Sequence, residues 1–182
     1  MRSFIHTPML PAGFMTAGLV VAGLMAAPSK GLAETPQTPV AEEAFADWRM
    51  TCLPSSLQPR CQMVQSVSLG EAGPAPFLLT ITARAGQEAS YGVITVPVGV
   101  YLAPGIEIVV DGGRPYKVLY ELCDQQGCYA SFRLDEPLLS SFRSGASARF
   151  RVWTAKTRAV EFPVSLKGFT AGWRAFQRAN EE

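Results

Sequence analysis

Short apolar runs, separated by glycine and proline, follow one another along most of this chain. Runs of this kind, bounded by turn-forming residues, are typical of β-strands. We predict strands at residues 45–52, 61–68, 77–84, 91–97, 106–111, 116–123, 128–134, 148–154 and 159–166. Apolar and polar positions alternate most clearly near the end of this series, where Phe150 and Val152 alternate with Arg149 and Arg151. Residues 156–158 would then form the turn of a hairpin between the last two strands.

Two segments carry helix signals instead. Asp135 suits an N-cap and Gly145 suits a helix end, which predicts a helix over residues 135–143. A second helix is predicted over residues 170–179, where Trp173 would dock the helix onto the sheet. Many short strands with only short helices predict an all-β fold, an antiparallel β-sandwich or barrel.

The first part of the chain has the pattern of a signal peptide rather than of a folded element. A polar start precedes an apolar run at residues 14–27, and Ala33 ends a segment of small residues suited to cleavage. The alternative is an uncleaved anchor, but the run is shorter than the roughly 20 residues that cross a bilayer as a helix. We therefore expect a signal peptide at residues 1–33, a flexible lead at 34–44 and a single domain at 45–179.

The charge balance excludes binding that depends on a strong overall field. The chain has 16 basic and 15 acidic residues, and cleavage would remove the basic residues Arg2 and Lys30. A mature chain that is nearly neutral has no whole-protein field to attract nucleic acid or an anionic membrane. We expect no nucleic-acid partner, and any anion binding would need a local patch.

The chain has one histidine, His6, which lies in the predicted signal peptide. The mature protein would lack the usual general base and the commonest ligand of transition metals. We therefore expect no enzyme, no metal and no cofactor. An exported enzyme that uses carboxylates alone is the remaining alternative. The adjacent Asp135 and Glu136 are better explained as a helix start, because a glycosidase pair stands roughly 5 Å or more apart across the sugar bond.

Four cysteines lie in the expected mature chain: Cys52, Cys61, Cys123 and Cys128. Their even number in an exported protein indicates disulfides. Each close pair bounds a short loop rich in turn formers, so we predict local bonds, Cys52 with Cys61 and Cys123 with Cys128. A redox couple or a zinc site is the alternative. Redox pairs usually have two intervening residues, whereas Cys123 and Cys128 have four. Zinc pairs usually have two to four intervening residues, whereas Cys52 and Cys61 have eight.

A basic cluster is the candidate binding site. Arg149, Arg151, Lys156 and Arg158 gather on the predicted hairpin, and Trp153 shares the strand face of the two arginines and is expected to be exposed. The functional interpretation is a face for an anionic glycan, an anionic lipid surface or another acidic partner. The alternative is a solvated face that protects an edge strand from aggregation.

Several ordered motifs together resemble the invasion-associated locus B family of bacterial exported proteins. They are Trp48-x3-Cys52 in "WRMTC", "CQMVQ" from Cys61, "VPVGVYLAPGIEIVVDGG" (96–113), the C-x4-C pair, "LDEPLLSSFRSG" (134–145) and "VSLKGFTAGWRAF" (164–176). The resemblance implies an immunoglobulin-like β-sandwich in the periplasm or at the cell surface, associated with virulence through bacterial entry into host cells. It implies no catalytic motif.

The sequence thus predicts a disulfide-stapled binding module of the bacterial envelope, with an envelope or host protein or an anionic surface as its partner. A periplasmic chaperone-like or envelope-maintenance factor that pairs with partner strands along a sheet edge is the alternative.

Overall fold

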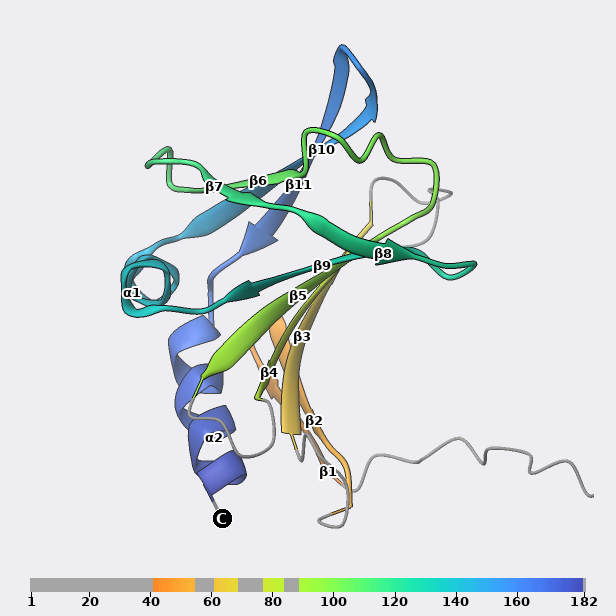
Figure 1. Ribbon diagram of the computed structural model, residues 1–182. Helices are drawn as coiled ribbons and strands as arrows, with labels where there is room; N and C mark the ends of the chain where they lie inside the picture. The colour runs from red at the N-terminus through yellow and green to blue at the C-terminus, as the bar shows by residue number, and fades with distance from the viewer. Residues whose placement is uncertain (1–40, 55–60, 69–76, 84–88, 182) are drawn as a thin grey trace, which may run out of the picture. The chain divides into compact units, whose positions relative to one another are not determined.

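The computed structural model describes residues 41–54, 61–68, 77–83 and 89–181. The predicted signal peptide at 1–33 lies outside the described residues, as do residues 34–40 of the predicted lead. The described residues belong to one compact unit, Pro36–Glu182. They form two antiparallel sheets and two helices (Figure 1).

The larger sheet has seven strands in the order β1-β2-β3-β4-β5-β9-β8, and every neighbouring pair is antiparallel. Its strands are β1 (Ala41–Phe45), β2 (Trp48–Cys52), β3 (Cys61–Val67), β4 (Phe77–Ala83), β5 (Ser90–Val96), β9 (Cys128–Arg133) and β8 (Tyr120–Cys123). Buried and half-buried residues alternate along β3, β4 and β5, as expected when one face of a sheet covers a core.

The smaller sheet has four strands in the order β11-β10-β6-β7. They are β11 (Arg158–Ser165), β10 (Ser147–Ala155), β6 (Ile106–Val110) and β7 (Tyr116–Val118). The two sheets pack face to face through aromatic rings. Phe77 of the larger sheet lies 5.1 Å from Phe150 and 4.8 Å from Phe162 of the smaller one, measured between ring centroids. The predicted antiparallel β-sandwich is confirmed.

Helix α2 (Phe169–Glu181) covers the part of the larger sheet formed by β1, β2 and β3 (Figure 1). Its first residue, Phe169, packs edge-on against Trp48 of β2, and Trp173 stacks on Phe176 within the helix. Gly172 lies so close to β3 that a Cβ there would come within 2.7 Å of Met63 Cε. The predicted docking of this helix through buried Trp173 is therefore confirmed.

Helix α1 (Glu136–Ser144) begins as the sequence predicts. The Asp135 side chain accepts a hydrogen bond from the Leu138 backbone N–H at 3.2 Å, which is the N-cap interaction. At the other end, the Gly145 N–H donates to the Ser141 carbonyl at 2.8 Å. The helix buries Leu138, Leu139 and Phe142, so three apolar residues dock it.

One buried polar side chain, Gln65 of β3, joins the two sheets in the described part of the chain. Its Oε1 accepts from the Ser165 N–H of β11 at 2.8 Å, and its Nε2 donates to the Ser165 carbonyl at 2.9 Å. The indole Nε1 of Trp48 donates to the same carbonyl at 2.9 Å. The Gln65 side-chain amide thus makes the two hydrogen bonds to β11 that a neighbouring strand would otherwise make.

Two boundaries differ from the sequence prediction. Residues 41–44, assigned to the flexible lead, belong to β1, and the expected strand 45–52 is broken by a turn at Ala46, whose φ of 51° is left-handed. The expected strand 116–123 is two strands that meet at Leu119. Its first half pairs with β6 in the smaller sheet and its second half with β9 in the larger one.

Candidate functional site: exposed surfaces of the sandwich

Both cysteine pairs form the predicted local disulfides, Cys52 with Cys61 and Cys123 with Cys128. In each pair the two residues stand directly opposite on adjacent antiparallel strands, with Cα atoms 4.0 Å apart. All four cysteines are thus disulfide-bonded, and the described residues contain no free cysteine. They also contain no cluster of three or more histidine, cysteine, aspartate or glutamate side chains that could hold a metal ion.

The predicted basic cluster divides into two parts, and its middle is neutralised. Arg151 Nη2 lies 2.6 Å from Glu161 Oε1, and Arg151 Nη1 lies 3.5 Å from Glu107 Oε2. Arg149 Nη1 lies 3.6 Å from Glu161 Oε2. The hydrogen bond from Arg151 lowers the pKa of Glu161, and the same bond raises the pKa of Arg151. These two arginines therefore carry little free charge for a ligand.

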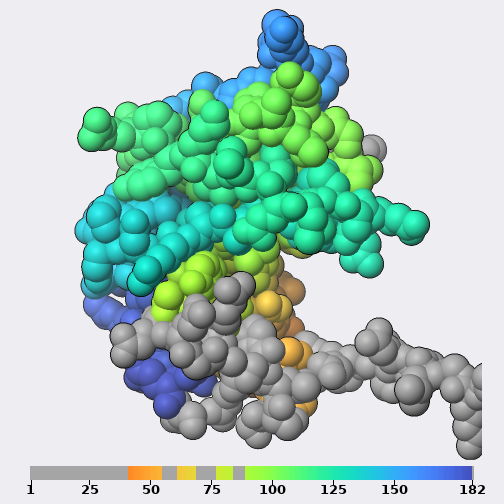
Figure 2. Space-filling model, in the orientation of Figure 1, coloured from red at the N-terminus to blue at the C-terminus, as the bar shows by residue number. Residues whose placement is uncertain are grey.

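The tip of the β10–β11 hairpin keeps its charge. Lys156 and Arg158 are exposed and have no ion pair within the described residues, and Arg158 Nε donates to Thr154 Oγ1 at 2.8 Å. Trp153, expected to be exposed, is half-buried, and its carbonyl accepts from the Tyr101 N–H at 2.7 Å. Figure 2 shows this tip, in blue, projecting from the top of the molecule.

Sequence reasoning missed the acidic partners of the arginines. Counting back from the Ala155–Arg158 pair at the turn would place Arg151 opposite Phe162. A bulge between Trp153 and Ala155 shifts the register, and Arg151 stands opposite Glu161 instead. A shift of one residue changes which residue of β11 stands opposite Arg151. The bulge that causes this shift cannot be recognised in the sequence.

A second surface, which the sequence analysis did not identify, exposes large apolar side chains. We call it the apolar crossing surface, because its residues lie on, or a few residues after, the segments where the chain passes from one sheet to the other. Its members are Val98, Tyr101, Leu102, Leu119 and Leu122.

The two segments of the apolar crossing surface adjoin each other. Residues 97–105 lead from β5 to β6, and Leu119 joins β7 to β8, the strand that contains Leu122. A Cβ on Gly105 would lie 3.4 Å from Leu119 Cδ2, so the segments are in contact. Figure 2 shows them, in green and teal, next to each other on one face. No local pattern indicates this surface, because the sequence predicts one continuous strand at 116–123, where the chain changes sheets.

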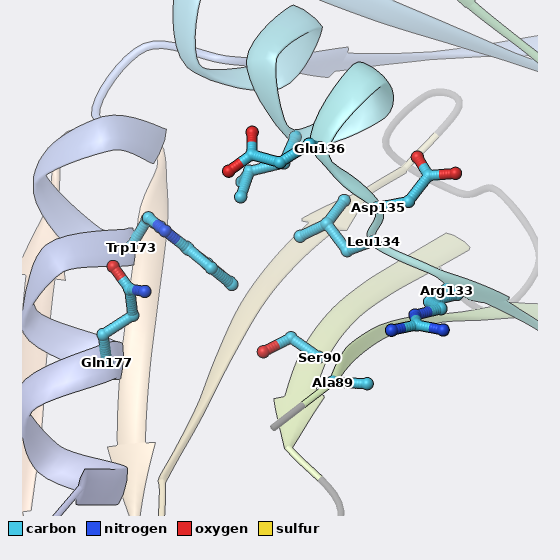
Figure 3. Close-up of a pocket in the computed structure, with 9 residues that line it drawn as sticks. Ala89, Ser90, Arg133, Leu134, Asp135, Glu136, Trp173 and Gln177 are labelled. Carbon is cyan, nitrogen blue, oxygen red and sulfur yellow. The ribbon is translucent and has the colours of Figure 1, made fainter. Parts of the chain in front are cut away.

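A hollow beside α2 is the third candidate (Figure 3). It has a volume of about 380 Å³, and Trp173 and Leu134 provide apolar walls. Asp135 and Glu136 also line it, but Figure 3 shows their carboxylates pointing in different directions. Asp135 is engaged as the α1 N-cap. This arrangement lacks the facing carboxylates that glycoside hydrolysis needs.

Comparison with known proteins shows to which family the chain belongs. The sequence model of the Invasion associated locus B (IalB) protein family matches residues 48–177. The chain belongs to the invasion-associated locus B family. The matched region includes both disulfides, Gln65 and the apolar crossing surface.

Relatives and a solved structure agree with this assignment. Two Brucella abortus proteins, each named an Invasion protein B homolog, are 27% identical over 131 residues, which is 71% of this chain and 75% of theirs. The crystal structure of invasion associated protein b from Bartonella henselae superimposes with a TM-score of 0.67 at 18% identity, over 78% of this chain and 99% of that one. That likeness concerns the fold. Among the described residues, no helix is long and apolar enough to span a membrane.

Proposed function

We propose that this member of the invasion-associated locus B family is an exported, non-catalytic binding protein of the bacterial envelope. The observation that carries the proposal is the apolar crossing surface. Leu119 is 66% exposed, Val98 57% and Leu122 55%. Single exposed apolar residues are common, but adjoining ones on one face typically mark a site of protein contact.

The rigidity of the scaffold supports a binding role. The apolar crossing surface lies where the chain passes between two sheets that share one aromatic core, and a disulfide closes the hairpin beside Leu122. A surface held in one conformation loses little conformational entropy when a partner binds. Export supports the same role, because disulfides persist in oxidising compartments such as the periplasm and the cell surface.

The names of the relatives suggest which partner to look for. The two Brucella abortus proteins are named as homologues of an invasion protein. We therefore propose that the partner is a protein of the bacterial envelope or of a host cell surface, and that contact with host cells is the setting in which binding matters. A chaperone-like role in the periplasm is the second candidate, and the free edge of β8 favours it.

Photo-crosslinking in living cells tests the proposal. A photoreactive residue replaces Leu119 in one strain, and it replaces Arg174 on the exposed side of α2 in a matched control strain. We expect discrete crosslinked bands of defined mass from position 119 that are absent at position 174. Identical patterns at both positions, or no crosslink at 119 under conditions of host contact or growth, would contradict the proposal.

A further inference from the structure

The apolar crossing surface lies between two charged ends of opposite sign. The tip of the β10–β11 hairpin forms one end, and the β8–β9 hairpin forms the other. Figure 2 shows the first in blue at the top and the second in teal at the right, with residues 97–105 in green between them. An apolar patch with a charged rim is typical of a protein interface, and the order of the charges indicates which partner fits.

Residues 97–105 form the uncharged middle of this face. They include no aspartate, glutamate, lysine or arginine, and they provide three of the five large apolar side chains of the apolar crossing surface. The segment starts next to the β8–β9 hairpin, because Val96 is paired with Cys128. It reaches the β10–β11 hairpin at Tyr101, whose N–H donates to the Trp153 carbonyl at 2.7 Å. The middle thus extends from one charged end to the other.

The tip of the β10–β11 hairpin is the basic end. Residues 152–160 include Lys156 and Arg158 and no aspartate or glutamate. Both basic side chains are exposed, and neither has an ion pair within the described residues. The arginines further along β10 pair with Glu161. The free positive charge of this hairpin is therefore at its tip.

The β8–β9 hairpin is the acidic end. Residues 119–132 include Glu121 and Asp124 and no lysine or arginine. Both carboxylates are exposed and accept hydrogen bonds from groups of the hairpin itself, and no ion pair within the described part of the chain neutralises them. Lys117, which precedes this stretch, stands opposite Glu107 in the smaller sheet. The hairpin therefore presents free negative charge.

This order of charges makes the face complementary to itself. A two-fold axis through the uncharged middle brings the basic tip of each copy to the acidic hairpin of the other, and it brings the two apolar middles together. In such an interface every contact occurs twice. Complementary charges favour this arrangement, and a wholly acidic or wholly basic partner would place like charges together at one end.

We propose that the apolar crossing surface binds a second copy of this chain in a two-fold symmetric dimer. Lys156 and Arg158 of each copy then face Glu121 and Asp124 of the other. The apolar side chains between them exclude water from the contact. This inference rests on the proposed binding function, because it names the envelope protein that covers the surface.

Sedimentation equilibrium of the oxidised protein recovered from the envelope tests the dimer. We expect the average mass to rise from that of one chain to that of two as the concentration increases. Salt should weaken the association, because it screens the ion pairs between the two ends. Leu119→Asp should weaken it at least about tenfold, because the contact would then bury an unpaired charge.

Two double variants test the contact between the ends. The tip variant is Lys156→Glu with Arg158→Glu, and the hairpin variant is Glu121→Lys with Asp124→Asn, which keeps an acceptor in the turn. Each variant alone should self-associate at least about tenfold more weakly than the wild type, because like charges meet at both contacts. An equal mixture of the two should associate again, because opposite charges then meet at both contacts.

Two further double variants are the matched controls. Arg174→Glu with Arg178→Glu on α2 changes the net charge as much as the tip variant does, and Glu43→Lys with Asp47→Asn at β1 matches the hairpin variant. All four control positions are exposed and lie outside the apolar crossing surface and its two charged ends. Each control should self-associate as the wild type does.

Four results would overturn the inference: a chain that stays monomeric up to about 1 mM, a dimer that the tip and hairpin variants leave intact, a mixture that does not associate, or equal losses in the controls. A monomer that binds vesicles of phosphatidylglycerol through this face would assign the face to a membrane instead. If Leu119 crosslinks to a different protein while the chain stays monomeric, the binding function stands and this occupant is wrong.

Discussion

Gln65 shows how a single buried amide takes the place of a strand. Its two polar atoms satisfy the N–H and the C=O of Ser165, and Trp48 shares the second group. The Gln65 side chain is nearly inaccessible to water, so no solvent replaces it when it is removed. Its contribution to stability is therefore measurable by one substitution.

We expect Gln65→Leu to lower the free energy of unfolding by about 1–3 kcal/mol, because the half-buried Ser165 N–H loses its hydrogen-bond partner. Urea denaturation followed by tryptophan fluorescence measures the change. Gln126→Leu, at the exposed hairpin tip, is the control and should change stability by less than about 0.5 kcal/mol. Equal stabilities of the Gln65 variant and the wild type would show that the amide does not bridge the sheets.

Tyr120 carries a buried hydroxyl that has no hydrogen-bond partner among the described residues. Burial raises the pKa of this phenol from 10.0 to about 12. Folding thus favours the neutral phenol. The contribution of Tyr120 to the free energy of unfolding is fully present below about pH 10. It is lost as the pH rises to about 12, because the phenol of the unfolded chain loses its proton at lower pH than the folded one.

We expect Tyr120→Phe to leave the free energy of unfolding unchanged or raise it at neutral pH, because the lost hydroxyl made no bond. Between about pH 10 and pH 12 the variant should gain stability relative to the wild type, as denaturation at several pH values would show. Tyr101→Phe changes an exposed tyrosine and is the control. A constant difference across the alkaline range would contradict burial of Tyr120.

At the scale of elements, the β10–β11 hairpin has a neutral middle and a charged tip. Glu161 and Glu107 offset the middle arginines, while Lys156 and Arg158 remain free of ion pairs within the described residues. If the hairpin binds acidic glycans, the tip is the part that contacts them. The middle then serves as an exposed ion-pair network on the sheet surface.

We expect the double variant Lys156→Glu with Arg158→Glu to lose most of its retention on a heparin column at low salt. Arg174→Glu with Arg178→Glu changes two exposed arginines of α2 and alters the net charge by the same amount. This control should elute close to the wild type. If both double variants lose retention equally, the overall charge is responsible and the tip is no site.

Elements with a locally visible cause were predictable from the sequence. The alternation around Phe150 predicts β10 because one face of that strand is buried, and Asp135 with Gly145 predicts α1 because the caps are local. β1 was not predicted, because four of its five residues are exposed and no alternation results. The division of 116–123 was not predictable either, because its two halves pair with neighbouring strands that belong to different sheets, β6 and β9, and no alternation within the segment shows that change of sheet.

The same distinction holds for the candidate sites. The disulfides follow from cysteine spacing, because each pair bounds a short turn between adjacent strands. The ion pairs of Arg151 depend on a bulge, and the apolar crossing surface depends on where the chain changes sheets. The edge strands are determined by the order of the sheets, which no local pattern reveals.

As a whole molecule, this invasion-associated locus B protein is a scaffold stapled by two disulfides, and we propose that it acts through its surface. Two disulfides bind the β2–β3 and β8–β9 pairs, and a core of aromatic rings joins the sheets. Loops of this length give each disulfide about 2–3 kcal/mol in the chain-entropy model. We infer that the four cysteines are structural and that their thiols are oxidised after export.

Intact-mass measurement of the protein recovered from the envelope is the decisive test of this inference. Each disulfide removes two hydrogens, so we expect a chain that begins at Glu34 and is four hydrogens lighter than its fully reduced form. Alkylation before reduction should add no mass. A chain whose four cysteines are alkylated without reduction, or which carries stoichiometric zinc, would show that the cysteines do not form structural disulfides.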